Sequence, residues 1–476
     1  MINNMFKFCC KKVIFALIFI IGNISLYGCF DSREVDELAY VMAMGVDKGK
    51  VSDIKVTFQL AVPAKVGSGE GENGGGGGGG SESTTITSVE APTIYSALEM
   101  INSYISKQIS LAHAKAIVFS EEIATEDLTR YIYAVSRGRE FRPDIQVIVS
   151  MNKAEDFIKN VKPKFEINPA KYYEMLLNSY SYTGVLSKSP IIDFFVDAKS
   201  IGRDPVAVLA ALNMQSSEDK SPQQVEQQDM QEQSGKTPQK EGKNEAENAG
   251  QSKEQEKNNE KNKFKEEIGK IKDKKMRDKL YERDFYAGIL PRDYEDKSEA
   301  LGLAVFKSGK MAGFLDGEET IAYNMVKGLY NYAYMTFKDP EEKDKYFVLN
   351  VKKSRKPAKK VKIEDGMPNI DVKLELEADI LSIQSGKNYE DPKKLHLIED
   401  AATKEIKTLI ERFLDKTSKQ LNADICGFGE IMKARCLTMK QWEETDWQNI
   451  YKNSKFNVDV KIKIRRPGLL IKSVNG

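Results

Sequence analysis

Histidine and cysteine are scarce in this sequence. Its 476 residues include two histidines, His113 and His396, and five cysteines. Histidine is the most frequent general base in enzymes and a common metal ligand, so two copies leave little room for either kind of site. His113 begins an apolar segment, which favours a structural role. His396 follows two lysines, which favours a position in solvent.

Sequence motifs that carry catalysis are also missing. The chain has no G-x-S-x-G motif, no H-E-x-x-H motif and no EF-hand loop. Gly235-Lys236-Thr237 resembles the end of a phosphate-binding loop, but Met230 occupies the place of the first glycine, and the surroundings are polar. The glycine run at 74–80 lacks the strand, helix and lysine of a phosphate site. We therefore expect no enzymatic activity, no catalytic residue, no metal and no cofactor.

A basic excess is absent as well. Residues 1–28 contain three lysines and no acidic residue, so without them 69 basic residues face 71 acidic ones. Nucleic-acid binding proteins usually carry a basic stripe, so we expect no nucleic-acid partner.

The sequence lacks an apolar run long enough to cross a bilayer, which needs ~20 residues. The best run, Val13 to Ile21, follows three lysines and leads into Leu26-Tyr27-Gly28-Cys29. A basic start, a short apolar segment and a small residue before the cut are typical of a secretory signal. A cysteine directly after the small residue makes this ending similar to a bacterial lipoprotein box, although Tyr27 is larger than that pattern prefers.

Residues 1–28 are therefore interpreted as a lipoprotein signal peptide, with cleavage after Gly28 and lipidation of Cys29. Each buried methylene of an acyl chain contributes ~0.8 kcal/mol, so two or more chains anchor a protein firmly. We expect Cys29 to hold the mature chain on the outer face of a cytoplasmic membrane. An uncleaved signal anchor is the alternative.

Of the other cysteines, Cys9 and Cys10 would leave with the signal, and Cys426 and Cys436 remain. A disulfide between these two is one interpretation. Two half-buried thiols are favoured, because disulfides mainly stabilise small domains that lack a sufficient core.

Two segments have compositions that do not support folding. Residues 67–83 form a flexible glycine-rich loop by composition, and residues 213–263 are predicted to be a disordered polar linker. Such segments bury too little apolar surface to offset an ordering cost of ~1–2 kcal/mol per residue. A charged helix is expected from Phe264 to Leu280. The linker divides the chain into an N-terminal domain, 29–212, and a C-terminal domain, 264–476.

The N-terminal domain alternates strands and helices. We expect strands at 38–46, 54–62, 114–119 and 145–149, and helices at 91–105, 121–135, 153–160 and 169–178. Pro92 would lie in the first turn of its helix, a favoured position. This order predicts an α/β to α+β fold, with several mixed-sheet layers and covering helices.

The C-terminal domain shows strict alternation in two segments, 370–380 and 456–464. Each would bury one face of a strand and expose the other. The first has mostly acidic outer residues and the second mostly basic ones, so we expect the two to be neighbours. A long amphipathic helix at 397–421 would cover this sheet. Trp442 and Trp447 are expected to pack onto the sheet, in preference to stacking on a ligand.

Both domains contain short motifs, which follow one another in a definite order. They are Gly28-Cys29-Phe30-Asp31, Glu34-Val35-Asp36-Glu37-Leu38, Met44-Gly45-Val46-Asp47-Lys48, Ala304-Val305-Phe306-Lys307, Lys310-Met311-Ala312-Gly313-Phe314-Leu315, Glu318-Glu319, Phe428-Gly429-Glu430-Ile431, the two tryptophans, and Arg465-Arg466-Pro467-Gly468. Their order and spacing resemble the Ger(x)C family, the lipoprotein subunits of spore germinant receptors. Phe30 stands where tryptophan is usual, and the glycine run and the polar linker are additional.

The resemblance implies a non-catalytic, lipid-anchored subunit that triggers spore germination together with multi-pass A and B membrane subunits. It implies a location on the outer face of the cytoplasmic (inner spore) membrane, and it places the nutrient on the B subunit. An extracytoplasmic solute-binding lipoprotein of a transporter is the alternative from another class. A cell-envelope hydrolase comes next and is disfavoured by the missing catalytic motifs.

Overall fold

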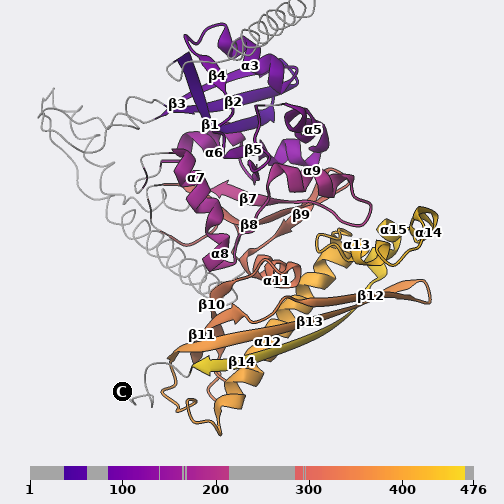
Figure 1. Cartoon of the computed structure of the whole chain (residues 1–476). Coiled ribbons are helices and arrows are strands. Elements are labelled where there is room, and N and C mark those ends of the chain that lie inside the picture. Colours follow the sequence, from indigo (N-terminus) through magenta and orange to yellow (C-terminus); the bar gives the residue numbers. More distant parts are fainter. Residues whose placement is uncertain are drawn as a thin grey trace, which may run out of the picture.

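Two mixed β-sheets, one after the other along an elongated body, form the molecule (Figure 1). The computed structural model describes residues 37–61, 84–138, 140–162, 166, 169–213, 285–292, 294 and 296–466. The predicted class, mixed sheets with covering helices, is confirmed. The predicted signal peptide, the glycine-rich loop at 67–83, the linker from residue 214 onward and the helix at 264–280 lie outside the described residues.

The first sheet has nine strands in the order β3-β2-β1-β5-β6-β7-β8-β9, with the short β4 beside β1. Pairing is parallel from β1 through β5 and β6 to β7, and antiparallel toward both edges. The strands are β1 (Leu38–Lys48), β2 (Ile54–Ala61), β3 (Thr84–Ala91), β4 (Gln108–Ser110), β5 (Ala116–Ser120), β6 (Gln146–Ser150), β7 (Val206–Leu212), β8 (Ser298–Lys307) and β9 (Lys310–Leu315).

Helices cover both faces of the first sheet. Alternate residues of the parallel strands belong to two separate cores, as the two-residue period of a strand requires. One face carries α3 (Ile94–Asn102), α4 (Glu121–Thr125), α5 (Thr129–Arg137) and α9 (Ile191–Lys199), and the other carries α6 (Ala154–Asn160) and α7 (Pro169–Asn178).

The motif Gly45-Val46-Asp47 positions α6 on the sheet. The buried Asp47 carboxylate accepts hydrogen bonds from the backbone N–H groups of Ala154, at 2.7 Å, and Glu155, at 2.9 Å. These are donors that the first turn of a helix leaves without intrahelical partners. A Cβ atom at position 45 would lie 2.9 Å from Ile158 Cδ1, so glycine allows the close approach. This family motif therefore has a structural role.

The predicted helix at 121–135 is two helices, α4 and α5. Between them, Leu128 N donates to Gly309 O at 2.9 Å, and Asp127 Oδ1 accepts from Thr129 N at 3.0 Å. The first bond ties this segment to the turn between β8 and β9, which local helical periodicity does not reveal.

The predicted helix at 91–105 begins later, at Ile94. Ala91 is the last residue of β3 and pairs with Ile54, and Pro92 precedes the N-cap residue Thr93, whose hydroxyl accepts from Ser96 N at 3.1 Å. Pro92 in the first turn was therefore a wrong prediction.

Strands β8 and β9 follow residue 264 in the sequence, yet they complete the first sheet beside β7. Asn213, the first residue of the predicted linker, is buried, and its Nδ2 donates to Leu290 O at 2.6 Å. The sequence did not predict that the chain returns to this sheet.

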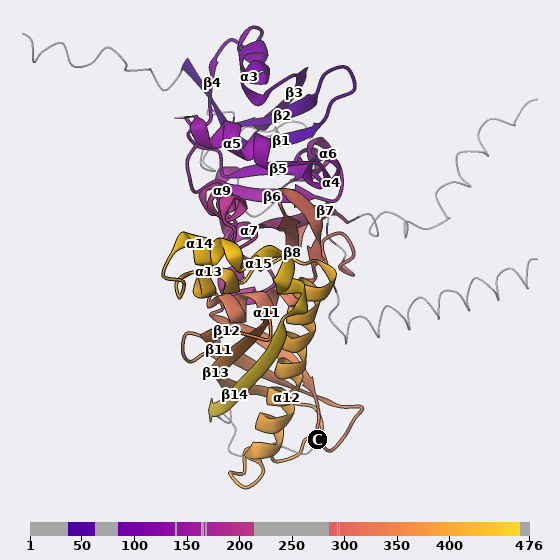
Figure 2. The ribbon, with the colours of Figure 1, turned by 90° about the vertical axis from the view of Figure 1, so that its right-hand side faces the viewer.

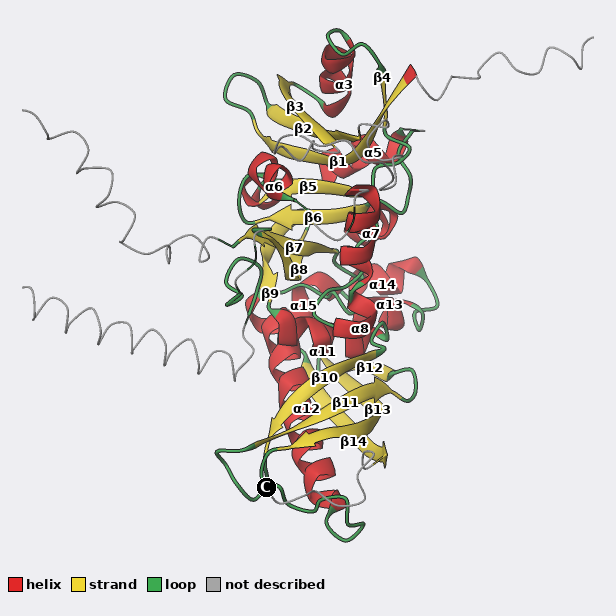
Figure 3. Ribbon diagram, turned by 90° about the vertical axis from the view of Figure 1, so that its left-hand side faces the viewer, coloured by secondary structure: helices red, strands yellow, loops and turns green. Residues whose placement is uncertain are grey.

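The second sheet has five strands, and a long helix lies against one of its faces. Strand β13 (Met367–Ile383) pairs with β11 (Tyr346–Lys353) and β12 (Ala358–Glu364) on one side and with β14 (Lys455–Arg466) on the other, and β10 (Tyr332–Lys338) pairs with β11. Helix α12 (Leu395–Asp415) packs along one face, and a π-helix, η3 (Lys416–Gln420), continues it (Figure 3).

The predicted strands of this sheet are confirmed, and so is their pairing. β13 and β14 are parallel neighbours, and Arg465 on β14 forms an ion pair with Glu377 on β13 at 2.9 Å. The inward residues of both strands are at most 6% exposed beneath α12, apart from the half-buried Phe456 at the start of β14. The alternation of apolar and polar residues and the charges of the outer residues were sufficient to predict these strands, because one face of each strand is exposed to solvent.

Short helices lie between the two sheets (Figure 2). They are α8 (Tyr180–Thr183), α11 (Gly317–Lys327), α13 (Phe428–Lys433), α14 (Met439–Glu444), α15 (Trp447–Ile450) and the 3₁₀ turn η4 (Tyr451–Asn453). The core of the second sheet extends through this layer to Val206, Leu303 and Val305 of the first sheet. The first sheet with its helices and the second sheet with its helices, which we call the two halves, therefore share a continuous apolar core.

Candidate coupling site at the junction of the two halves

Two loops meet where the halves join: residues 200–205, between α9 and β7, and residues 421–427, between η3 and α13. Two hydrogen bonds join the loops at one pair of aspartates, one between backbone groups and one from a backbone N–H to a carboxylate. Asp204 N donates to Asp424 O at 3.0 Å, and Asp424 N donates to the Asp204 carboxylate at 2.8 Å. We call these two segments the junction loops.

The Asp204 carboxylate pairs with a lysine as well as with the opposing loop. The Nζ of Lys307, the last residue of β8, lies 3.1 Å from its Oδ2, and the aspartate is 7% exposed. Burial raises the pKa of the Asp204 carboxyl, and the Lys307 ammonium opposes that rise. A buried carboxylate paired in this way costs free energy if one partner is removed, because the other charge is left without compensation.

Asp424 organises the opposing loop. Its Oδ1 accepts from Phe428 N at 3.0 Å, and its Oδ2 accepts from Gly429 N at 2.7 Å and from Trp447 Nε1 at 3.1 Å. Asp424 is buried, and burial raises the pKa of its carboxyl to about 6, with the neighbouring Asp204 adding to the rise. The three donors hold α13 and α15 against the junction.

Two glycines allow the junction loops to touch. A Cβ atom on Gly429 would lie 2.6 Å from Gly202 O and 2.5 Å from Trp447 Nε1, closer than real Cβ atoms approach other atoms. Next to this contact, Ser200 Oγ donates to the Glu430 carboxylate at 2.5 Å. The motif Phe428-Gly429-Glu430-Ile431 therefore forms one side of the contact between the halves.

Further polar contacts surround this centre. Arg203 pairs with Asp197 at 2.6 Å, and Lys327 Nζ donates to Ile425 O at 3.2 Å. Burial raises the pKa of the Asp197 carboxyl to about 6, against the opposing effect of Lys327 and Arg203. On the other side of the loop, Lys359 Nζ donates to Cys426 O at 3.4 Å. Side chains from both halves thus fix the loop at 421–427.

The thiol at the junction is not a reactive nucleophile. Cys426 and Cys436 are unpaired, and burial raises the pKa of the Cys426 thiol to about 12. A thiol with so high a pKa is almost entirely protonated at neutral pH and is unreactive. Among the described residues, no three His, Cys, Asp or Glu side chains form a metal-binding group. The arrangement is suited to holding two bodies in a fixed relation.

The other residues singled out in the sequence lie apart from the junction or within its packing. His113 is exposed and stacks edge-on against Tyr40, with ring centroids 4.9 Å apart, and His396 is exposed on α12, as predicted. Trp442 and Trp447 are at most 2% exposed and belong to the core of the second sheet, which confirms the packing prediction.

Cys29, Gly28 and Gly235-Lys236-Thr237 lie outside the described residues. Within the described ones, no helix is both long and apolar enough to span a membrane.

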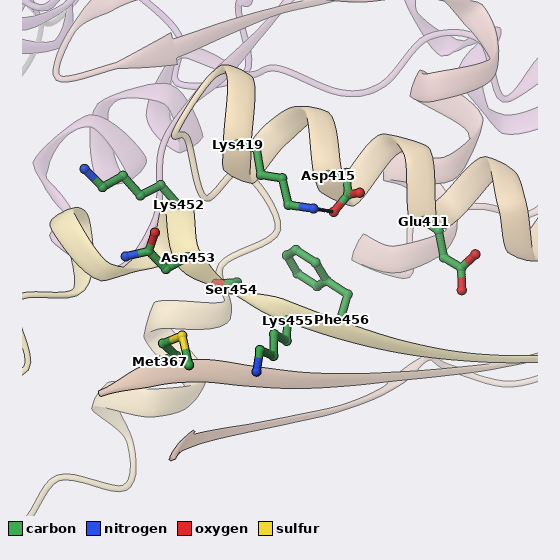
Figure 4. A pocket seen from close by; sticks show the side chains of 9 residues that line it. All are labelled: Met367, Glu411, Asp415, Lys419, Lys452, Asn453, Ser454, Lys455 and Phe456. Atoms are coloured by element: carbon green, nitrogen blue, oxygen red, sulfur yellow. Dashed lines mark ion pairs between the residues drawn. The ribbon is translucent and has the colours of Figure 1, made fainter. Parts of the chain in front are cut away.

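A groove of about 740 Å³ lies between the end of α12 and the start of β14 (Figure 4). Its lining includes Glu411, Met367 and Phe456, together with three lysines, and Lys419 pairs at 2.8 Å with Asp415, four residues earlier on the same wall of the groove. The groove contains no histidine, cysteine or buried acid.

Sequence reasoning did not find Asp204 and Asp424. A signal was present for Asp424, which follows Ala423 and precedes Ile425 and Cys426. An acid within an apolar segment is seldom buried without a partner, so this pattern indicates a buried, hydrogen-bonded carboxylate. Its partner, 220 residues away, is not readable from one sequence.

Comparison with known proteins gives consistent matches in both halves. Residues 31–212 match the model of the spore germination protein N-terminal domain, and residues 301–468 match that of the spore germination B3/GerAC-like C-terminal domain. The chain is 24% identical to spore germination protein KC of Bacillus subtilis (strain 168), over 96% of this chain and 97% of that protein. It is 20% identical to spore germination protein GerQC of Bacillus cereus, over 95% and 98% respectively. The crystal structure of the GerBC protein aligns with a TM-score of 0.46 and 15% identity, covering 88% of this chain and 96% of that one.

Proposed function

This chain belongs to the Ger(x)C family of spore germination proteins, and from that premise we propose that it is a lipid-anchored, non-catalytic subunit of a nutrient germinant receptor. In this role it works with multi-pass A and B membrane subunits on the outer face of the cytoplasmic (inner spore) membrane. The observation that carries the proposal is the family match in both halves, in the family's order.

The junction supports a coupling role. Asp204 N donates to Asp424 O and Asp424 N donates to the Asp204 carboxylate across the halves, and an apolar core continues between them. A force applied to one half is therefore transmitted to the other through short bonds and packed side chains. A subunit that holds two membrane proteins in a fixed relation needs this rigidity and needs no reactive group.

Deletion of the gene tests the proposal. Spores that lack this chain should form normally, yet fail to germinate with the nutrient that their receptor serves. They should still germinate with calcium dipicolinate, which bypasses receptors. The test belongs in a strain with a single receptor operon, with loss of the A subunit as the matched control. Normal nutrient germination in that strain contradicts the proposal.

Anchoring through Cys29 has its own test. Cys29→Ser removes the thiol that would receive the diacylglycerol group, so we expect the variant to leave the detergent phase in a phase-partition assay. The reason is that acyl chains supply the membrane affinity, at ~0.8 kcal/mol per buried methylene. Cys436→Ser is the control, since this half-buried thiol lies on the folded body. Equal partition of wild type and Cys29→Ser would favour an uncleaved signal anchor.

The alternative function, a solute-binding lipoprotein of a transporter, makes a different prediction. Its gene should lie beside those of an ABC permease, whereas a receptor subunit should lie beside a pair of genes for the A and B membrane proteins.

A further inference from the structure

The outer end of the first sheet carries few charges. Strand β3 ends the strand order on that side, and α3 and the loop from α3 to β4 follow it in the sequence. Of the 24 residues from Thr84 to Lys107, which we call the end segment, three are charged, whereas 30% of the whole chain is charged. Figure 2 and Figure 3 show α3 at one end of the elongated body and the second sheet at the other.

The three charged residues of the end segment are Glu90, Glu99 and Lys107. The Glu90 carboxylate accepts hydrogen bonds from the backbone N–H groups of residues 50–52, at 2.7 to 3.1 Å, so it serves the loop between β1 and β2. Glu99 is exposed on α3, and Lys107 is half-buried before β4. The end segment therefore has no cluster of charge of either sign.

Exposed apolar and aromatic side chains occur there instead. Met100, in the last turn of α3, is 44% exposed, and Tyr104, in the loop that follows, is 57% exposed. The Tyr104 hydroxyl shares a hydrogen bond with Thr87 Oγ1 at 2.7 Å, which holds the ring beside β3. Asn102 and Ser103, between the two in sequence, are exposed and uncharged. An amphipathic ring, a thioether and uncharged polar groups are suited to the boundary between water and lipid.

The loop that contains Tyr104 adjoins the place where the chain enters the fold. β4 pairs with the first residues of β1, and Leu38 lies opposite Gln108. Because the two strands are parallel, the residues that precede Leu38 and those that precede Gln108 lie at the same end of the pair. A lipid on Cys29 would therefore arrive beside the loop from α3 to β4.

The length of the tether limits where the bilayer can lie. Cys29 is eight residues before Glu37, and eight residues span at most ~29 Å. From β1 the outer strand β3 is two strand spacings away, ~10 Å, whereas β9 is five spacings away in the other direction, ~24 Å, with the layer of short helices and the second sheet beyond it. A bilayer at Cys29 can therefore meet the end segment, and it could reach the second sheet only if the body lay flat.

We infer that the end segment rests on the lipid surface, with Met100 and Tyr104 in the headgroup region and the second sheet held away from the membrane. The inference rests on the proposed function, because the lipid on Cys29 supplies the attachment. Few charges favour this contact, since uncharged polar groups lose less hydration free energy than ions do. Two side chains are too few to bind a bilayer alone, so this surface orients a body that the acyl chains anchor.

Fluorescent labels on the full lipidated chain test this orientation. A label is attached to Met100→Cys or Tyr104→Cys in a Cys436→Ser background, where the Cys29 thiol carries the lipid and the Cys426 thiol is buried. The chain is placed on phosphatidylcholine vesicles that contain no other protein. We expect brominated acyl chains to lower the fluorescence at 100 and 104 at least about twofold, since an interfacial side chain lies ~5–10 Å into the boundary of headgroups and acyl chains.

Matched labels on apolar residues exposed elsewhere provide the controls. Leu437 lies between α13 and α14, Leu381 lies on β13 of the second sheet, and both are more than half exposed. Labels on Leu437→Cys and Leu381→Cys should lose less than about a tenth of their fluorescence, because they would lie beyond the interface. Met100→Glu should reduce the quenching at 104, because a carboxylate is costly to bring into lipid, and Leu437→Glu should leave it unchanged.

The outcomes separate the two proposals. If the lipidated chain does not remain on the vesicles, or if Cys29→Ser remains equally, the lipid-anchor part of the proposed function fails. If the chain remains but 100 and 104 are quenched no more than 381 and 437, only the orientation inference fails. Quenching at 381 or 437 alone would place another face on the bilayer and overturn it. Quenching at 100 and 104 that requires added A and B subunits would assign the end segment to a protein partner and would also overturn it.

Discussion

Asp424 faces opposing demands in the folded protein. Burial disfavours its negative charge, while Phe428 N, Gly429 N and Trp447 Nε1 all need an acceptor. Burial dominates, since the pKa is raised to about 6 from an ordinary value of 3.8. The folded state therefore binds this proton more tightly than the unfolded chain does.

The stability of the chain should depend on pH through this residue. Because the folded pKa lies above the unfolded one, the unfolding free energy should rise as pH falls from about 6 toward 4, and the contribution should be constant above 6. Asp424→Asn should flatten this rise and, by placing an amide N–H against backbone donors, cost about 1–3 kcal/mol at pH 7. Urea unfolding at several pH values measures both effects.

Two other acidic residues, Asp197 and Glu155, also affect how the unfolding free energy depends on pH. Asp197, with its pKa also raised to about 6, contributes a rise of the same sign, so Asp197→Asn should reduce the rise further. Burial also raises the pKa of Asp204 and of Asp47, and these two acids should account for what remains. Burial acts to raise the pKa of Glu155, but hydrogen bonds from Lys159 and Lys55 lower it to about 2. Its stabilising contribution is lost as pH falls from about 4.5 toward 2, so it affects only the low end of the window. A pH profile of Asp424→Asn parallel to that of wild type would contradict the assignment.

At the scale of elements, the sequence predicts secondary structure best where one face of a strand or helix is exposed to solvent. β13 and β14 were predictable because their alternation and opposite outer charges are written in consecutive residues. α12 was predictable for the same reason, from its apolar stripe. In these elements local pattern and tertiary environment agree.

Elements without such a pattern were missed. Every residue of β7 is buried, so its run of apolar residues shows no alternation. β3 has mainly small polar residues and follows the glycine-rich segment. The break between α4 and α5 depends on a bond to Gly309, far along the chain. The junction site was missed for the same physical reason, since Asp204 and Asp424 meet only through the tertiary fold.

The polar segment between the halves gives a prediction at this scale. From 215 to 262 the apolar residues are Val225, Met230, Ala246 and Ala249. These four residues can bury only a small apolar surface. We therefore expect replacement of 215–262 by a short Gly/Ser linker to leave the thermal midpoint of the lipid-free chain nearly unchanged. Scanning calorimetry of both forms provides the measurement. A fall of many degrees would show that the segment packs on the folded body.

At the scale of the molecule, the chain returns to its first sheet before it forms the second. It builds most of the first sheet, leaves at Asn213, and returns as β8 and β9 to complete that sheet before it forms the second. Phe306 of β8 packs against Phe194 of α9 with ring centroids 5.0 Å apart. The first sheet is therefore incomplete without β8 and β9, which follow the polar linker in the sequence. The junction loops then fix the second half against this sheet.

This topology predicts how fragments should behave. Residues 30–213 alone leave the β7 edge unpaired and remove Leu303, Ala304 and Phe306, each fully buried in the intact chain. We expect that fragment to aggregate or to melt without cooperativity, because an open apolar edge pairs with other chains. Joining residues 30–213 through a Gly/Ser linker to 285–316 should give a monomer with a cooperative melt. Its thermal midpoint should stay below that of the full chain, since Val305 and Leu315 lose their contacts with the second core. Size-exclusion chromatography and circular dichroism measure the difference, and a monomeric, cooperatively melting 30–213 fragment would show that the halves are separable at residue 213.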